Sequence, residues 1–346
     1  MSNEPIGRFL RACKRLPVDA TPVWFMRQAG RYMPEYRAIR KKFGLLDMIT
    51  HPEIAAEVTL QPVYAHGVDA AILFSDILLP LLPMGFDLEF VKGIGPHIGN
   101  PFRTKEDLCR LKIFDVKGEL WHVMETIKIL CRELPDNVAL IGFSGAPFTV
   151  ASYMIEGGSS KDFQHVKSLM YADPETWHTL MEKLTNVLVD YLVSQIEMGA
   201  QAIQVFDTWV GTCSPQDYRE YVFPYSQQML TAIRSTGVPA IHFGTNTASL
   251  LPQMKEAGGD VIGLDWRIPL DQGWELLGED VAVQGNLDPM ALFAPRHILQ
   301  EKVKDVIARA GNRVGHIFNL GHGVSQFTSP DNVKAIVDMV HEWTAK

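Results

Sequence analysis

Arginines gather early in the sequence in a pattern that suits anion binding. Residues 27–42 hold six basic residues and one acidic residue, although the whole chain carries a formal charge of −8. They directly follow an apolar run at 22–26, and they include Gly30, where the backbone can turn or approach a ligand closely. Guanidinium groups bind carboxylates and phosphates through paired hydrogen bonds. A solvated basic face explains most charge runs, but the position after a buried-type strand favours a binding site here. The candidate side chains are those of Arg27, Arg31 and Arg40.

Four further polar residues are candidates because of their surroundings. Asp76 follows the apolar run 70–74 and precedes more apolar residues, so its carboxylate would lie in a low dielectric; the alternative is a helix cap or turn aspartate. His322 lies between two glycines, which indicates a tight loop and favours a functional role. Tyr153 fits a buried helix tyrosine as well as a functional hydroxyl. Thr208 follows a strand, where it could equally cap a helix.

Other polar residues at strands stay ambiguous from sequence. His242 lies within an apolar run, and a lone strand histidine is more often a hydrogen-bonded barrel residue than a metal ligand. No cysteine stands two positions after it, so a zinc site has no support and we expect no metal. Asp207, Asp265 and Asp288 each follow a strand, where structural ion pairs and functional roles look alike.

These residues require a scaffold that brings strand ends together. Eight short, nearly all-apolar runs alternate with helical patterns, as in a parallel sheet buried on both faces. We expect an α/β fold, a single, somewhat distorted (β/α)8 barrel of the TIM type that spans residues 1–346, with the site at the carboxyl ends of the strands. A doubly wound sheet is the alternative, weakened by the absence of G-x-G-x-x-G after the first run. The runs are Val23–Met26, Ala70–Phe74, Val138–Ile141, Ala202–Phe206, Pro239–Phe243, Val261–Leu264, Val281–Val283 and His316–Phe318.

Local signals predict where several helices begin. A capping box at Thr50 to Glu53 predicts a helix that runs to about His66. Further starts are expected at Asp173-Pro174, at Pro295 and at Ser329-Pro330. Residues 77–103 show no helical period, and we expect a long excursion there with a short hairpin near 87–92.

Composition excludes several classes of protein. The acidic balance and a pI near 5.8 argue against nucleic-acid or membrane-surface binding. The longest apolar run, 77–86, is broken by prolines and is too short to span a bilayer. The first residues show no signal-peptide pattern, and four scattered cysteines indicate reduced thiols, so we expect a cytoplasmic protein.

Two long motifs stand out in the chain, 26–37 (MRQAGRYMPEYR) and 141–149 (IGFSGAPFT). They resemble the first and second signatures of the uroporphyrinogen decarboxylase family, the first being the more specific, and the resemblance runs over roughly residues 5 to 343. The shorter matches are 73–77 (LFSDI), 156–159 (EGGS), 261–266 (VIGLDW), 284–289 (QGNLDP) and 319–323 (NLGHG).

The resemblance implies a homodimeric, cofactor-free enzyme. Such an enzyme removes carbon dioxide from the four acetate arms of uroporphyrinogen III and gives coproporphyrinogen III, in porphyrin and heme biosynthesis. The resemblance implies that Asp76 accepts the pyrrole N–H groups, that Arg27, Arg31 and Arg40 serve substrate carboxylates and a proton relay, and that Phe206 packs near the macrocycle. Tyr153, Thr208 and His322 match the remaining side-chain contacts. The implied substrate-binding set is Arg27, Gln28, Ala29, Gly30, Arg31, Asp76, Tyr153, Phe206, Thr208 and His322, and the catalytic set is Asp76, Arg27, Arg40, Tyr153 and His322.

This chemistry agrees with the residues. A substrate with eight carboxylates suits a local arginine cluster, and a pyrrole protonated at its α-carbon can serve as its own electron sink, so no cofactor is needed. The proton would come through a relay bound to Arg27 or Arg40, and Asp76 would stabilise the pyrrolic cation. Two other functions remain open: a corrinoid-linked methyltransferase on the same barrel, disfavoured because no H-x-C zinc site is present, and a tetrapyrrole carrier without catalysis.

Overall fold

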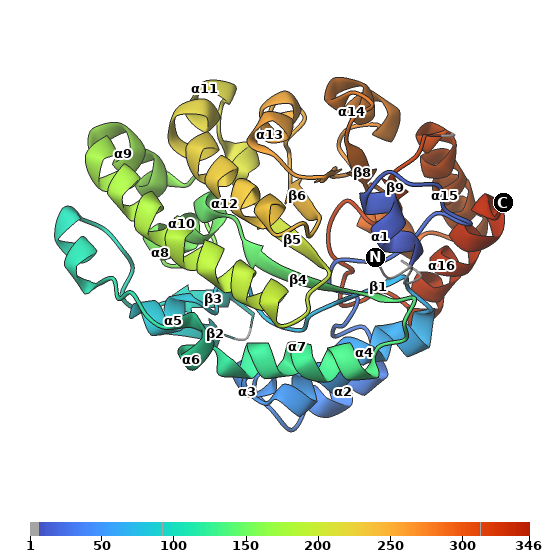
Figure 1. Cartoon of the computed structure of the whole chain (residues 1–346), viewed down its shortest axis with the longest axis horizontal. Helices are drawn as coiled ribbons and strands as arrows, with labels where there is room; N and C mark the ends of the chain where they lie inside the picture. The colour runs from blue at the N-terminus through green and yellow to red at the C-terminus, as the bar shows by residue number, and fades with distance from the viewer. Residues whose placement is uncertain (1–6, 92, 312) are drawn as a thin grey trace.

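A curled parallel sheet with helices around it forms the framework of the protein (Figure 1). The structure is a computed structural model that describes residues 7–91, 93–311 and 313–346. Seven strands pair in the order β1-β4-β5-β6-β7-β8-β9. Their bounds are β1 Ala70–Ile72, β4 Ala139–Gly145, β5 Ala202–Asp207, β6 Ala240–Gly244, β7 Val261–Gly263, β8 Ala282–Gln284 and β9 His316–Ile317. Each therefore falls within or overlaps one of the expected runs.

The first expected run takes the eighth position of the barrel, but it is not a regular strand. Val23 makes a single parallel bridge to Phe318, and the Phe318 N–H donates to the Pro22 carbonyl at 2.9 Å. Toward β1, the Asp69 N–H donates to the Val23 carbonyl at 2.8 Å, while the Val23 N–H donates to the Asp69 carboxylate at 2.7 Å. Prediction of a strand at Val23–Met26 was wrong, because a side chain replaces the backbone ladder on one side and Pro22 has no N–H to donate. The fold is thus a distorted (β/α)8 barrel, as expected.

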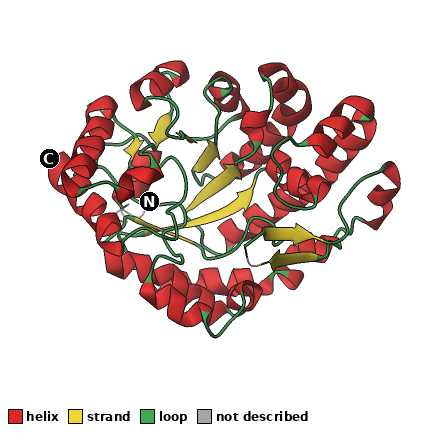
Figure 2. Cartoon of the chain, turned by 180° about the vertical axis from the view of Figure 1, so that it is seen from behind, coloured by secondary structure: helices red, strands yellow, loops and turns green. Residues whose placement is uncertain are grey.

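Helices cover the outside of the sheet, as Figures 1 and 2 show. The longer ones are α4 Pro52–His66, α7 Trp121–Glu133, α8 Pro147–Glu156, α9 Gln164–Ala172, α10 Pro174–Glu197, α12 Phe223–Ser235, α14 Leu270–Leu277, α15 Arg296–Ala310 and α16 Pro330–Thr344. Shorter helices are α1 Arg8–Cys13, α2 Pro34–Arg40, α3 Leu45–Thr50, α5 Leu81–Met84, α6 Val116–Glu119, α11 Pro215–Asp217 and α13 Leu251–Ala257. In the part of the chain that the structure describes, no helix is long and apolar enough to cross a membrane.

Three of the four expected helix starts are confirmed. Helix α10 begins at Pro174, and the Asp173 carboxylate accepts the Thr176 N–H at 3.1 Å, while α15 and α16 follow Pro295 and Ser329. The capping box at Thr50 is wrong. Thr50 is the last residue of α3, and α4 begins at Pro52, a residue whose fixed φ favours the first helical turn.

The expected excursion after β1 carries the expected hairpin. Strands β2 Leu88–Val91 and β3 Gly95–Ile98 pair antiparallel, so the hairpin extends further than predicted; position 92 lies outside the described residues. The Ile98 N–H donates to the Gly157 carbonyl at 2.9 Å, which fixes the hairpin against the end of α8.

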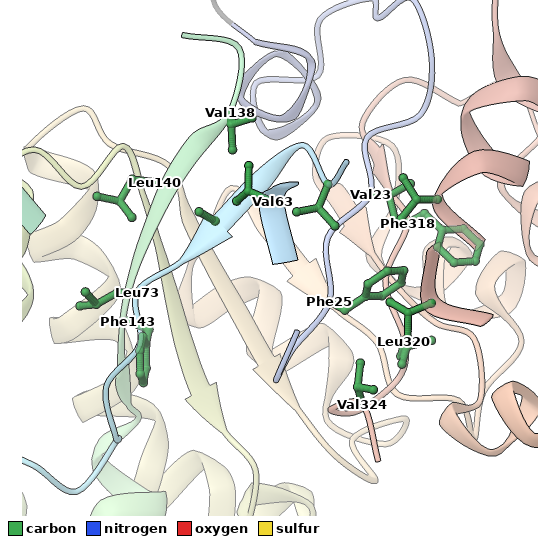
Figure 3. Close-up of a cluster of buried hydrophobic side chains, with 14 of the residues drawn as sticks. Val23, Phe25, Val63, Leu73, Val138, Leu140, Phe143, Phe318, Leu320 and Val324 are labelled. Carbon is green, nitrogen blue, oxygen red and sulfur yellow. The ribbon is translucent and has the colours of Figure 1, made fainter. Parts of the chain in front are cut away.

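Apolar side chains on both faces of the sheet form the core. Residues 22–26, here called the closing segment, complete the barrel between β9 and β1. Figure 3 shows Val23 and Phe25 of this segment packed beside Phe318 and Leu320, on the face toward the helices. The intervening residue Trp24 points into the barrel, where it packs with residues at the start of several strands and with α1. Burial on both faces explains why the runs read as continuously apolar.

Candidate functional site

The arginine loop, residues 27–31, follows the closing segment and begins with a residue in the left-handed conformation. Arg27 has φ +61°, a conformation that costs a non-glycine residue about 1–2 kcal/mol and persists where its surroundings enforce it. Its side chain is exposed and lies against Gly323, where an added Cβ would come within 2.5 Å of Arg27 Cδ. Among the described residues, neither Arg27 nor Arg31 has an ion-pair partner. Within that part of the chain, the loop therefore presents positive charge that is not tied up in an ion pair, as an anion site requires.

Gln28 anchors this loop. Its side chain is fully buried, accepts the Phe25 N–H at 3.1 Å and donates to the Ala70 carbonyl at 3.0 Å. The side chain of Gln28 is thus already occupied, so any contact with a ligand would involve its backbone. Ala29 and Gly30 are half-buried, and their N–H groups have no acceptor within the described ranges. Those two N–H groups remain open to an anion.

Asp76 lies just beyond the carboxyl end of β1, half-buried against the apolar residues that follow it. Its Oδ1 accepts the Leu78 N–H at 2.9 Å. Burial raises the pKa of Asp76 from 3.8 to about 6, although the Leu78 N–H and the positive charge of Arg27 both act to lower it. The carboxylate is therefore ionised at neutral pH but poorly solvated. Such a group interacts strongly with a nearby cation.

Tyr153 and residues after β5 face the same region. Tyr153 is a helix residue of α8, half-buried, with its ring 5.8 Å from that of Trp209. Burial raises the pKa of Tyr153, and the charge of Asp76 raises it further, while Trp209, Ser159 and Arg27 lower it. Tyr153 therefore lies within electrostatic reach of both Asp76 and Arg27.

Phe206 and Thr208 flank the end of β5. The half-buried ring of Phe206 makes edge-to-face contacts with Phe143 at 5.6 Å and with Phe243 at 6.2 Å, which forms an aromatic group inside the barrel. Thr208 is half-buried and does not cap a helix; its carbonyl accepts the Thr245 hydroxyl at 2.6 Å. Phe206 therefore offers an apolar ring surface to a ligand, and Thr208 offers a hydroxyl beside it.

His322 sits in a tight loop after β9, as expected. Its Nδ1 accepts the Gly323 N–H at 2.7 Å. Burial lowers the pKa of His322 to about 4, and the charges of Arg27 and Arg267 lower it further, against the opposing effect of Asp265. The imidazole is therefore neutral at physiological pH and has Nε2 available as a donor.

Arg27, Asp76, Tyr153 and His322 therefore form one electrostatic group at the carboxyl ends of the strands. Arg40 lies near the group rather than among its four members. Its Nη1 donates to the Phe43 carbonyl at 2.7 Å, and its charge acts on Tyr36, whose ring lies 5.8 Å from that of Phe74. Arg31 is exposed and also lies near Tyr36.

Two site neighbours were not singled out from the sequence. Trp209 packs against Tyr153, and Arg267 stacks 4.0 Å over the ring of Trp266 while its Nη1 donates to Asp265 at 2.5 Å. The sequence signal that could have found them is a tryptophan shortly after an apolar run: Trp209 after 202–206, and Trp266, next to Arg267, after 261–264. Two hollows, of about 520 and 400 Å³, lie outside this group, one between α4 and α7 and the other between the end of β7 and α15.

The ambiguous aspartates have structural partners. Asp265 accepts the Asn246 N–H as well as Arg267, and Asp288 Oδ1 accepts the Met290 N–H at 2.8 Å. Asp207 lies 3.5 Å from His242, both fully buried. Within residues 7–91, 93–311 and 313–346, no three histidine, cysteine or acidic side chains converge as metal ligands would.

Comparison with known proteins gives a consistent result. A sequence model of uroporphyrinogen decarboxylase (URO-D) matches residues 4–343. The uroporphyrinogen decarboxylases of Sorangium cellulosum and Carboxydothermus hydrogenoformans are each 54% identical over 334 residues, which cover 96% of this chain and 95% of those proteins.

Among solved structures, a methyltransferase from Methanosarcina mazei superimposes with a TM-score of 0.77 at 20% identity, covering 97% of this chain and 98% of the other. At that identity the likeness concerns the fold alone, and it supports the barrel architecture. The sequence matches span nearly all of the chain, so it belongs to the uroporphyrinogen decarboxylase family.

Proposed function

We propose that this chain decarboxylates uroporphyrinogen III to coproporphyrinogen III, converting its four acetate arms to methyl groups. The observation that carries the proposal is Asp76, a poorly solvated carboxylate with a pKa of about 6 that lies within reach of Arg27. Family membership and the unpaired charge of the arginine loop support it, because the substrate has eight carboxylates.

In this mechanism the pyrrole ring itself receives the electrons. A proton adds to the α-carbon of the ring, and the cation that results is delocalised onto the pyrrole nitrogen. The C–C bond to the carboxylate then breaks, its electron pair neutralises the cation, and carbon dioxide leaves. Addition of a proton to the exocyclic carbon, and loss of the proton first added to the ring carbon, then give the methyl group. Each arm thus consumes one proton and releases one carbon dioxide, without an external oxidant or reductant.

Asp76 accepts the pyrrole N–H groups and stabilises the cation. Above pH 6 it is ionised, so its negative charge stabilises the positive charge that develops as the ring is protonated. The charge of Arg27 acts on Asp76, whereas Arg40 bonds to Phe43. We therefore assign Arg27 to the reacting acetate and its proton source, and Arg31 and Arg40 to more distant carboxylates.

The remaining contacts follow from position. The open N–H groups of Ala29 and Gly30 bind a substrate carboxylate, with Gln28 holding the loop in place. Phe206 packs against the macrocycle, and the hydroxyls of Tyr153 and Thr208 face its rim. His322, which is neutral, donates through Nε2 to a carboxylate.

The proposal extends to the organisation of the protein. The chain is one barrel domain that acts as a homodimer in the cytoplasm, and it needs no metal or organic cofactor because the pyrrole is the electron sink. Size-exclusion chromatography with light scattering tests the dimer.

The decisive experiment is anaerobic turnover of uroporphyrinogen III by metal-stripped protein, with the products oxidised and separated by carboxylate number. Conversion through partly decarboxylated intermediates to coproporphyrin supports the proposal. Tight binding without loss of carboxylates would instead identify a carrier. Absence of uroporphyrinogen binding, together with methyl transfer once zinc and a methyl donor are added, would identify a methyltransferase.

A further inference from the structure

Thr149, the last residue of the motif at 141–149, links two elements that carry site residues. It lies in the first turn of α8 and is fully buried. Its hydroxyl donates to Asp207 Oδ1 at 3.0 Å and accepts the Trp209 N–H at 3.2 Å. One hydroxyl therefore joins the start of α8 to the end of β5 and to the loop that follows it.

The same hydroxyl lies one helical turn from Tyr153. Residues four apart in a helix share a face, so Tyr153 projects from α8 on the same side as the Thr149 hydroxyl. The ring of Tyr153 packs 5.8 Å from that of Trp209. The backbone N–H of Trp209 is the one that donates to the Thr149 hydroxyl. Trp209 in turn contacts Phe163 at 5.6 Å. Helix, loop and the two rings thus form a closed set of contacts around Thr149.

Asp207, the acceptor, does not face the site. It is fully buried in the layer between β5 and the helices, and its Oδ2 lies 3.5 Å from His242 Nε2. Its neighbours Phe206 and Thr208 are both half-buried candidates for substrate contact. Asp207, the last residue of β5, therefore lies behind the site and holds the Thr149 side chain through their hydrogen bond.

We propose that the Thr149 hydroxyl, anchored by Asp207, is a positioning group for the decarboxylation site, and that it holds Tyr153 and Thr208 at the spacing the substrate requires. This inference rests on the proposed function. Thr149 does not touch the substrate; it acts through Tyr153 and the loop. Its loss therefore affects the transition-state geometry more than it affects binding, which depends mainly on the arginine loop.

The test compares three variants in the anaerobic assay. Thr149→Val keeps the shape of the side chain and removes both hydrogen bonds. We expect it to lower kcat by roughly tenfold to a hundredfold, as a misplacement of about 1 Å does, with little change in KM. Thr149→Ser retains the hydroxyl, so it restores kcat close to the wild-type value. Thr185→Val is the matched control: this threonine is equally buried, but its hydroxyl bonds to the Met181 carbonyl of its own helix.

Asp207→Ala provides a second line of evidence by removing the acceptor. It should reproduce the kcat loss of Thr149→Val, and the double variant should lose no more than either single variant, because both act through one bond. If the wild-type protein turns over, either of two results would overturn this inference alone. One is an unchanged kcat in Thr149→Val; the other is a Thr149→Ser variant as slow as Thr149→Val. Wild-type protein without turnover would overturn the proposed function and this inference with it.

Discussion

Replacing Asp76 by asparagine should stabilise the protein while it removes activity. Burial raises the pKa of this carboxyl from 3.8 to about 6, so the folded state binds its proton more tightly than the unfolded state does. A shift of about two units corresponds to about 3 kcal/mol of destabilisation once the group is ionised. Stability from this group is therefore lost as the pH rises from about 4 through 6, and the amide avoids that loss.

The change in unfolding temperature follows from the length of the chain. With an unfolding entropy of roughly 2 cal/mol/K per residue, 346 residues convert about 3 kcal/mol into a rise of about 4 °C at pH 7.5. At pH 4 the wild-type carboxyl is largely protonated, so the difference should nearly vanish. Turnover should fall on the order of a thousandfold, because a charge pair about 4 Å apart is worth roughly 4 kcal/mol at an effective dielectric of about 20.

Calorimetry across this pH range and the anaerobic assay measure the two effects separately. Asp288→Asn is the control for stability, since Asp288 also follows a strand, is half-buried and accepts the N–H two residues on. An unfolding temperature that does not rise at pH 7.5 would show that the Asp76 carboxylate is well solvated. Near-wild-type turnover would refute its role in stabilising the cation.

Three further measurements test the rest of the site. Arg27→Ala should lower kcat/KM about a hundredfold, equivalent to one charge-assisted contact of about 3 kcal/mol; Arg27→Lys should recover only part of it, and a comparable loss in Lys41→Ala would contradict a specific role. The imidazole of His322, with its pKa lowered to about 4, should show no NMR titration between pH 5.5 and 8, and a midpoint near 6.5 would refute its burial. Gln28→Leu leaves two buried backbone groups unpaired and should cost about 4 kcal/mol in urea unfolding; a loss below about 1 kcal/mol would contradict its anchoring role.

Sequence reasoning located the strands well because their burial on both faces leaves a plain signal. It overestimated the first one, at Val23–Met26, because the Asp69 side chain that replaces its ladder comes from a distant segment. It also misplaced a helix start, because Thr50 to Glu53 fits the capping pattern while Pro52 provides the stronger signal. Local patterns thus fail where a competing local signal or a long-range side chain decides.

The candidate site shows the same division. Asp76 and His322 could be picked out because barrel strands bring their carboxyl ends together. The anchoring role of Gln28 could not, since its two backbone partners become visible only when the closing segment meets β1. The link between Thr149 and Asp207 likewise depends on how α8 packs against β5.

The closing segment also bears on how the protein matures during synthesis. Its anchors include Phe318 and the Asn319 side chain, which accepts the Met26 N–H at 3.4 Å. A ribosome that adds about 5–20 residues per second needs roughly 15–60 s to go from one partner to the other. Through that interval the contacts of residues 22–26 with Asp69 and of Gln28 with Ala70 can form, but those with Phe318 and Asn319 cannot, so the barrel stays open on that side. The candidate site is therefore among the last features to mature, and a chain that ends before Phe318 would not complete it.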